Sequence, residues 1–365
     1  MACEVAACMP WTRFRDLLRD SGPKSEIAER DAAAADGVHP SEACHSLAQS
    51  IEALTSSEPD MEAEDVELCL RLVLGLINGR GEDSRLLAIE VAERLLEDDT
   101  PAKLVACLDR LGFEARKQAM RTFGAVLKAA PSETVVEYMR ERPSISQMLL
   151  EGSGNSEVFI CCSNMLRACS RNAGLVEVLL RNGATKRLID LARCENFDIS
   201  SEAFASLRDL LTAHPATSAA FLQENFGCFF EDYHVLLQAD NYATRRQALR
   251  LLSEVLLDRA LMEIMVKYVS KADFLQIHMN LLRDGSRAIQ IDTFHVFKIF
   301  AANPNKPRRV QQILFQNKDR LIKFLKTTIG ALQNDKVFNR DLETVIRVLG
   351  GLEAPSKLPS GLSSP

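Results

Sequence analysis

The sequence is poor in the residues that mark disulfide-linked and strand-rich proteins. Its ten cysteines form no CxxC pair and are scattered through 365 residues, so neither a disulfide framework nor a zinc site of the usual ligand spacing is expected. It has only 17 glycines, 13 prolines and 6% aromatic residues, whereas leucine, alanine, glutamate, arginine and lysine recur throughout. This composition favours helices over a fold with many tight turns.

An excess of positive charge and long uncharged runs are also missing. The 44 basic and 50 acidic residues are mixed along the chain and give a net charge of -6, which argues against nucleic-acid binding as the main function. No uncharged run approaches the roughly 18 residues that a membrane span needs, and Glu4 precedes the first short apolar run without a basic leader. We therefore expect a cytoplasmic protein without nucleic-acid binding or membrane insertion.

Catalytic and cofactor-binding motifs are absent too. The chain contains no phosphate-binding loop, dinucleotide fingerprint, nucleophile elbow or zinc-protease helix, and no acidic run has the spacing of a calcium-binding EF-hand loop. No two of its six histidines are four residues apart. We expect no catalytic residue, no cofactor and no metal site, so the protein is predicted not to be an enzyme.

What the sequence does contain is an internal repeat. Five similar stretches recur: KQAMRTFGAVLKAAP from Lys117, FICCSNMLRACSRNA from Phe159, SEAFASLRDLLTAHP from Ser201, RQALRLLSEVLLDRA from Arg246 and QIDTFHVFKIFAANP from Gln290. Their starts are 42, 42, 45 and 44 residues apart in the numbering. This period is typical of armadillo and HEAT repeats, in which two or three helices form one layer. The predicted fold is therefore all-α, an armadillo/HEAT-like helical-repeat solenoid.

Aligned positions in the five stretches predict which side chains are buried. The seventh, tenth and eleventh positions are apolar in every stretch, and their spacing of three and four places them on one helix face. We expect a shared core there that includes Phe123, Leu207, Leu252 and Phe300. The sixth and ninth positions are mostly polar, so His295 and Lys298 are expected on the surface rather than in a catalytic pair.

The ends of the chain do not follow the repeat. Residues 1–46 are predicted to form a divergent, partly disordered segment with a short helix at Trp11 to Arg19. Residues 47–352 are predicted to form the helical-repeat domain, and residues 353–365 a disordered tail.

A second kind of apolar segment lies between the repeat stretches and is interrupted by asparagine. The asparagines are Asn182, Asn225 and Asn317. Each is predicted to end a helix, because Asn tolerates the left-handed conformation that often closes one.

Aromatic and basic residues gather in the segment DNYATRRQALRLLSEVLLDRA. Arg246 and Arg250 are one helical turn apart and follow Tyr242. Exposed Arg beside Tyr is typical of a protein-binding hot spot, because both offer large contact areas and Arg forks onto carboxylates. The alternative is that these arginines are solvated or pair with Glu254 and Asp258 along the same helix.

Several long motifs in the chain resemble one known family. They are FDISSEAFASLRDLLTAH from Phe197, NYATRRQALRLLSEVLLDR from Asn241, YVSK from Tyr268, MNLLRDGSRAIQ from Met279 and FHVFKIFAANPNK from Phe294. They are similar to motifs of the Mo-twenty-five scaffold family, also called the HymA or calcium-binding protein thirty-nine family. The likeness runs from about Leu104 to Leu349.

This resemblance implies a curved helical-repeat scaffold without catalytic activity. Members of the family bind kinases and pseudokinases of the Ste-twenty-like group, including the STRAD pseudokinase that activates the LKB kinase. The concave face holds the kinase domain in its closed, active-like conformation, and a pocket toward the C-terminal end binds a Trp-Glu-Phe-like peptide from the partner's tail. The alternative function is a generic solenoid adaptor for an unrelated protein cargo.

Matching motifs carry the family's binding residues onto this sequence. The resemblance implies a kinase-binding concave surface made of Phe197, Tyr242, Arg246, Arg250, Arg259 and Met262. It implies a peptide pocket made of Arg246, Met279, Gln316 and Arg320. Three positions depart from the family's usual residues, since Met262 replaces an aromatic residue, Gln316 a lysine and His278 a hydrophobic residue. These departures predict an altered partner specificity.

Overall fold

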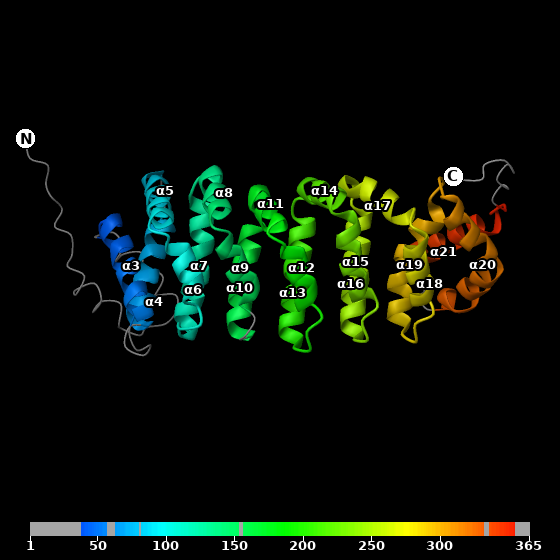
Figure 1. The fold of residues 1–365 in the computed structure, drawn as a ribbon, viewed down its shortest axis with the longest axis horizontal. Helices are drawn as coiled ribbons and strands as arrows, with labels where there is room; N and C mark the ends of the chain where they lie inside the picture. The colour runs from blue at the N-terminus through cyan, green and yellow to red at the C-terminus, as the bar shows by residue number, and fades with distance from the viewer. Residues whose placement is uncertain (1–37, 57–62, 80–81, 153–155, 332–335, 355–365) are drawn as a thin grey trace, which may run out of the picture. The chain divides into compact units, whose positions relative to one another are not determined.

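The computed structural model describes residues 38–56, 63–79, 82–152, 156–331 and 336–354 (Figure 1). The predicted short helix at Trp11 to Arg19 lies outside these ranges, as does the tail from residue 355 onward. The first described helix begins at Pro40, before residue 47, where the repeat domain was predicted to start. By its internal contacts the chain divides into two compact units, residues 1–214 and residues 215–365.

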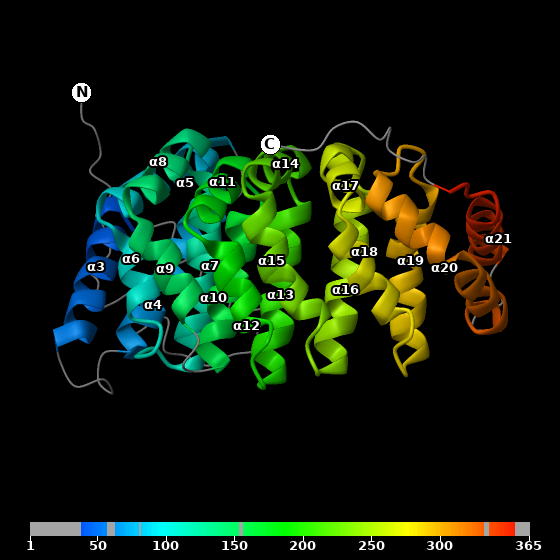
Figure 2. The ribbon, with the colours of Figure 1, turned by 45° about the vertical axis from the view of Figure 1, so that its right-hand side comes forward.

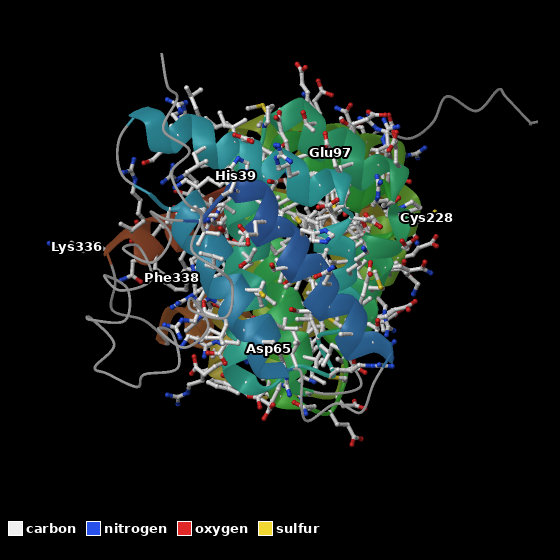
Figure 3. The ribbon with its side chains drawn as sticks, turned by 90° about the vertical axis from the view of Figure 1, so that its left-hand side faces the viewer. His39, Asp65, Glu97, Cys228, Lys336 and Phe338 are labelled. Carbon is white, nitrogen blue, oxygen red and sulfur yellow. The ribbon has the colours of Figure 1, made fainter. Side chains whose placement is uncertain are left out.

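Every regular element in the described part of the first unit is a helix. The helices are α3 (Pro40–Ser56), α4 (Ala63–Ile77), α5 (Glu82–Glu97), α6 (Thr100–Ala106), α7 (Phe113–Ala129), α8 (Ser132–Glu141), α9 (Pro143–Glu151), α10 (Ser156–Cys169), α11 (Ala173–Arg181), α12 (Ala184–Leu191) and α13 (Phe197–Thr212). Helices α4, α7, α10 and α13 pack in series, while α8 packs on α11 and α9 on α12 (Figures 1 and 2). Figure 3 views this unit from α3, with Asp65 on α4 and Glu97 at the end of α5 labelled.

The second unit is equally helical in its described residues, which confirms the all-α class for both units. Its helices are α14 (Pro215–Glu224), α15 (Phe226–Leu237), α16 (Tyr242–Leu257), α17 (Met262–Val269), α18 (Ala272–Leu281), α19 (Arg287–Ala302), α20 (Arg308–Thr327) and α21 (Lys336–Gly350), with short 3-10 helices η1 (Arg259–Leu261) and η2 (Ile329–Ala331). Helix α16 packs on α19 and α19 on α21, while α15, α18 and α20 pack beside them.

The five repeat stretches coincide with five long helices, α7, α10, α13, α16 and α19. In four of the repeats the long helix follows two shorter α-helices of 8 to 12 residues. A layer of two short helices and one long helix is the unit of an armadillo-like repeat, which buries its apolar face only against the next layer. The predicted helical-repeat solenoid is confirmed.

Most of the predicted core positions are buried, while Leu127, Ala168 and Ile299 are half-buried. Phe123, Leu207 and Phe300 are fully buried, and Leu252 is 2% exposed. The prediction for the sixth position was wrong in three of the five stretches, because the residues there, Thr122, Ser206 and Leu251, are buried as well. Helix α7 contacts α4, α5 and α10, α13 contacts α10 and α12, and α16 contacts α15, α17 and α19, so the buried face of a long helix is wider than one stripe.

His295 and Lys298 on α19 do not form a solvated pair. Lys298 Nζ donates a hydrogen bond to Asp341 Oδ2 on α21 at 2.6 Å, and both side chains are half-buried. The His295 ring lies 5.9 Å from the Phe338 ring of α21, edge to face. The predicted surface position is corrected because α21 packs over this face of α19, and the two residues join the two helices.

The three asparagines behave differently from one another. Asn182 follows α11 and Asn225 precedes α15, so both mark helix boundaries, but their φ angles of -82° and -108° are not left-handed. Gly183 takes the left-handed conformation at the first boundary, with φ of 78°. Asn317 lies inside α20, so its prediction was wrong, because its side chain donates to the Ile313 carbonyl at 2.8 Å and lets the helix continue.

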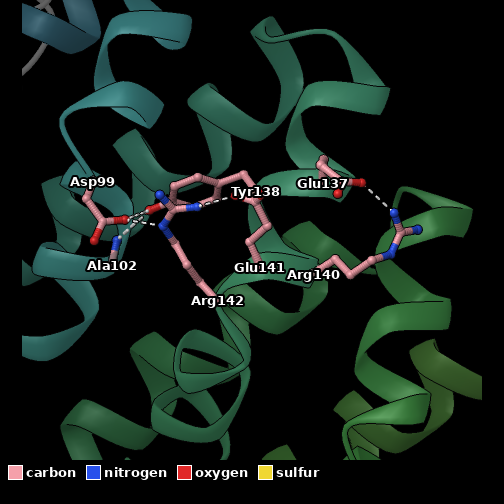
Figure 4. A network of polar contacts seen from close by, with 7 residues as sticks. All are labelled: Asp99, Ala102, Glu137, Tyr138, Arg140, Glu141 and Arg142. Carbon is pink, nitrogen blue, oxygen red and sulfur yellow. Dashed lines mark hydrogen bonds and ion pairs between the residues drawn. The ribbon is translucent and has the colours of Figure 1, made fainter.

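A half-exposed polar network joins two layers of the first unit (Figure 4). The Tyr138 hydroxyl on α8 donates to Asp99 Oδ1 at 2.7 Å and accepts from the Ala102 N–H at 3.3 Å. Arg142 Nε donates to the same Asp99 oxygen at 2.7 Å, and its guanidinium lies 4.3 Å from the Tyr138 ring centre. Asp99 takes a left-handed backbone conformation with φ of 56°, which Asp tolerates better than most residues. Its carboxylate serves these partners instead of capping α6.

The second unit has a buried aromatic cluster with two histidines. The Tyr268 hydroxyl on α17 lies 3.1 Å from His234 Nε2 on α15 and 2.8 Å from His278 Nε2 on α18. Because a hydroxyl has one proton, it donates to one imidazole and accepts from the other. The Phe230 ring packs 4.8 Å from the Tyr268 ring, edge to face. Burial lowers the pKa of His234 to about 4 and the pKa of His278 to about 3.

Candidate functional site

Two exposed aromatic residues stand at the first position of long helices. Phe197 begins α13 and is 67% exposed, and Tyr242 begins α16 and is 44% exposed. The residue before each is an asparagine, Asn196 or Asn241, whose side-chain oxygen accepts hydrogen bonds from the second and third N–H groups of the helix. These caps fix where each helix begins and hold the aromatic ring at its outer end.

Arg246 is held by its neighbours. Its Nε donates to Asp292 Oδ2 on α19 at 3.2 Å, and its Nη1 lies 3.4 Å from the Tyr242 hydroxyl. The hydrogen bond to Asp292 raises the pKa of Arg246. The alternative that this arginine pairs along its own helix is therefore replaced by a pair between α16 and α19, and Arg246 presents its guanidinium already oriented by Asp292.

Arg250, Arg259 and Met262 are exposed, in contrast to Arg246. Arg250 lies one turn after Arg246 on α16. Arg259 begins the 3-10 helix η1, where the Asp258 side chain accepts from the Ala260 N–H at 2.8 Å. Met262 begins α17 and is 55% exposed. Arg259 on η1 and Met262 at the start of α17 thus present a cation and a flexible apolar side chain to solvent.

The predicted peptide-pocket residues occupy three helices of the second unit. Met279 on α18 is half-buried, and α18 packs against α20. Gln316 and Arg320 are exposed on α20, one turn apart. No hydrogen bond or ion pair among the described residues joins Arg246 to the other three, so the pocket remains a prediction.

His278, the neighbour of Met279 in the sequence, belongs to the core. Its side chain is fully buried and bonds the Tyr268 hydroxyl. Its Nδ1 atom has no hydrogen-bond partner within the described parts of the chain. His278 is therefore part of the interior of the second unit.

Sequence reasoning missed one exposed aromatic residue. Phe113 begins α7 and is 70% exposed, and it lies four residues before the first repeat stretch, as Phe197 and Tyr242 do before theirs. Extending the repeat alignment by four residues would have found it. In the first unit, Phe113 and Phe197 are thus equivalent positions two repeats apart.

Features of other kinds of site are not found where the structure is described. No group of three or more His, Cys, Asp or Glu side chains in these ranges lies close enough to hold a metal ion. None of the described helices combines the length and the apolar character needed to cross a bilayer.

The stacked helical layers, with aromatic, methionine and arginine side chains exposed at helix starts, define a repeat protein of the kind that binds other proteins. A family model described as Mo25-like matches residues 34–353. The chain therefore belongs to the Mo25-like family, and this membership indicates a scaffold role.

Curated relatives come from distant organisms. Calcium-binding protein 39-like from Homo sapiens is 35% identical over 80% of this chain and 88% of its own length. The Mo25-like protein from Schizosaccharomyces pombe is 36% identical, over 78% of this chain and 88% of its own. The degreening-related gene dee76 protein from Auxenochlorella protothecoides is 35% identical, over 84% and 97% respectively. Among solved structures, a designed armadillo repeat protein in complex with the peptide (KR)4 is similar over 70% of this chain and 99% of that chain, with a TM-score of 0.41 and 16% identity.

Proposed function

We propose that this protein is a non-catalytic, cytoplasmic scaffold that binds and activates a kinase or pseudokinase of the Ste-twenty-like group, as in STRAD/LKB-type complexes. The observation that carries the proposal is the exposure of Phe197, Tyr242 and Met262 at the motifs that resemble the family's kinase-binding surface. Large apolar side chains lose their unfavourable hydration when a partner covers them, and exposed arginines beside them add directed contacts.

Activation requires no chemistry from this chain. A scaffold that binds the closed kinase conformation more tightly than the open one shifts the equilibrium by the difference between the two binding free energies. A tenfold increase in the active population needs about 1.4 kcal/mol of such a difference. One or two hot-spot contacts made only with the closed conformation are sufficient.

The clean test uses Arg250 and Arg259 rather than Arg246. Replacing Arg246 with Ala leaves the half-buried Asp292 carboxylate without its ion-pair partner, which mixes a stability effect with a binding effect. No ion pair engages Arg250 or Arg259 in the described structure. The double variant Arg250→Ala/Arg259→Ala should therefore weaken kinase binding by about 1–3 kcal/mol. The stability of the scaffold itself should change little.

The measurement is kinase activity of a purified Ste-twenty-like kinase or STRAD/LKB-type complex, titrated with wild type and the double variant. Val337→Ala is the matched control, because Val337 is 67% exposed on α21, outside the predicted surface. Half-maximal activation at a clearly higher concentration of the double variant than of wild type or the control supports the proposal. Failure of the wild type to bind any of these kinases would favour the generic adaptor instead.

The peptide pocket is proposed as a second contact for the same partner. Met279 would supply adaptable apolar contact for an aromatic side chain, and Arg320 a charge for a carboxylate. Because Arg246 is already paired with Asp292, Arg320→Ala should weaken a labelled Trp-Glu-Phe-like peptide more than Arg246→Ala does. Equal affinities for wild type, Met279→Ala and Arg320→Ala would remove the pocket from the proposal.

A further inference from the structure

Helix α20 carries an excess of positive charge. Six of its 20 residues are Arg or Lys and one is Asp, in a chain whose net charge is -6. Five of the six cations are exposed, and they are Arg308, Arg309, Arg320, Lys323 and Lys326. These five residues are called the basic strip below. The sixth cation, Lys318, is half-buried and lies 4.7 Å from the centre of the Phe315 ring.

The basic strip lies on one face of the helix as two groups near its two ends, with Gln312, Gln316 and Asp319 on the same arc between them. At 100° and 1.5 Å per residue, its members fall within about one third of the helix circumference and cover about 27 Å along the axis. It faces away from the buried side of the helix, which consists of Val310, Ile313, Leu314, Leu321 and Leu325. An extended polypeptide of about eight residues has the same length.

Internal ion pairs do not account for these charges. Within the described residues, no carboxylate lies within ion-pair distance of the strip, whereas Arg245, Arg246 and Lys298 of the same unit each pair with an aspartate. Arg308 and Arg309 also stand in the first turn of α20, where the helix dipole disfavours cations, and no side chain caps this helix start. Lys326 lies in the last turn, where the dipole favours it. The helix dipole therefore accounts for the positive charge at the C-terminal end of the strip, but not for the two arginines at its N-terminal end.

We propose that the basic strip docks an acidic polypeptide segment of a partner protein, in an extended conformation along α20. The charge and the length of the strip match such a segment. A membrane surface fits less well, because none of the exposed large apolar residues of the described chain lies on α20 to insert into a bilayer. The inference concerns residues outside the predicted peptide pocket, apart from Arg320, and does not depend on the partner being a kinase.

The test measures fluorescence anisotropy of a labelled octaglutamate peptide with the full chain, at about 50 mM and about 300 mM salt. The variant is Arg309→Glu/Lys323→Glu/Lys326→Glu. Its matched control is Lys271→Glu/Arg283→Glu/Arg287→Glu, which makes the same change in net charge at three exposed positions of the same unit. Circular dichroism verifies that both remain helical. If charge reversal unfolds α20, the neutral variant Arg309→Ala/Lys323→Ala/Lys326→Ala is measured in its place.

We expect the wild type and the control to bind the peptide at low salt, and the strip variant to bind about 10-fold or more weakly, with the neutral variant in between. High salt should weaken wild-type binding, since the contacts are exposed. Equal losses in the strip variant and the control, or no binding by the wild type, overturn the proposal. So does binding to phosphatidylserine vesicles without binding to the peptide. Binding of a Trp-Glu-Phe-like peptide to the strip variant is measured in parallel. If that peptide still binds, the loss of octaglutamate binding is due to the basic strip and not to damage of the proposed peptide pocket.

Discussion

Each unit of the protein uses a tyrosine hydroxyl to join helices, but the two hydroxyls have opposite surroundings. Tyr138 in the first unit is buried, but its hydroxyl bonds a backbone N–H and the Asp99 carboxylate, which is partly exposed, as is Arg142 beside it. Tyr268 in the second unit lies fully buried between two imidazoles. Burial raises the pKa of both phenols, and the Asp99 carboxylate adds to this for Tyr138. The comparison teaches that solvent access and the type of partner decide how a similar contact responds to mutation and pH.

The largest expected effect comes from removing the aromatic support of Tyr268. Phe230 is fully buried and packs against Tyr268, Phe226 and Phe229. Phe230→Ala should lower the free energy of unfolding by roughly 3–5 kcal/mol, because it leaves a cavity among rigid rings. Hydrogen exchange followed by mass spectrometry should show the loss in α15, α17 and α18. Protection in these helices equal to that of wild type would show that the cluster does not hold the second unit together.

The next effect is a loss of stability of the second unit in mild acid. Both buried histidines have a folded-state pKa well below the unfolded value of 6.5, so the unfolded chain binds protons that the folded chain does not. The resulting stability is fully present above pH 6.5 and is lost as the pH falls toward the folded pKa values. At pH 5 the loss should be about 2 kcal/mol for each histidine.

Exchange protection of α17 and α18, compared at pH 7 and pH 5 after correction for intrinsic exchange rates, measures this loss. The control is His278→Gln, which keeps a hydrogen-bonding side chain but does not titrate, and it should remove about half of the pH dependence. Helices α8 and α9 of the first unit should lose less protection, since no histidine lies within either. A pH response that is the same in both sets of helices contradicts the comparison.

The repeat, its period and most of the core of the long helices could be predicted from the sequence. This is because the apolar stripe of each long helix recurs even where the other helices of the layer differ in sequence. The sequence did not predict that Thr122 and Ser206 are buried, since periodicity within one helix does not reveal how many neighbours cover it. Nor did it show that Arg246 pairs with Asp292 and Lys298 with Asp341, because partners more than 40 residues apart are brought together only by stacking. Phe113 was within reach of the alignment and was missed.

A smaller effect is expected in the first unit, at Tyr138. Tyr138→Phe removes the hydroxyl that donates to Asp99 and accepts from the Ala102 N–H, while the ring and its packing remain. The free energy of unfolding should fall by about 1–2 kcal/mol, since Asp99 keeps Arg142 as a partner and the Ala102 N–H loses an acceptor in the first turn of α6. The loss should be visible as faster exchange in α6 and α8.

Arg142→Lys separates the hydroxyl from the charge in this network. Lysine keeps the positive charge near Asp99 but cannot reproduce the guanidinium contact with the Tyr138 ring, so a loss of about 0.5–1 kcal/mol is expected at this half-exposed site. The double variant Tyr138→Phe/Arg142→Lys should lose less than the sum of the single losses, because both side chains share one Asp99 oxygen. Strictly additive losses would show that the contacts of Tyr138 and Arg142 with Asp99, drawn in Figure 4, contribute independently to stability.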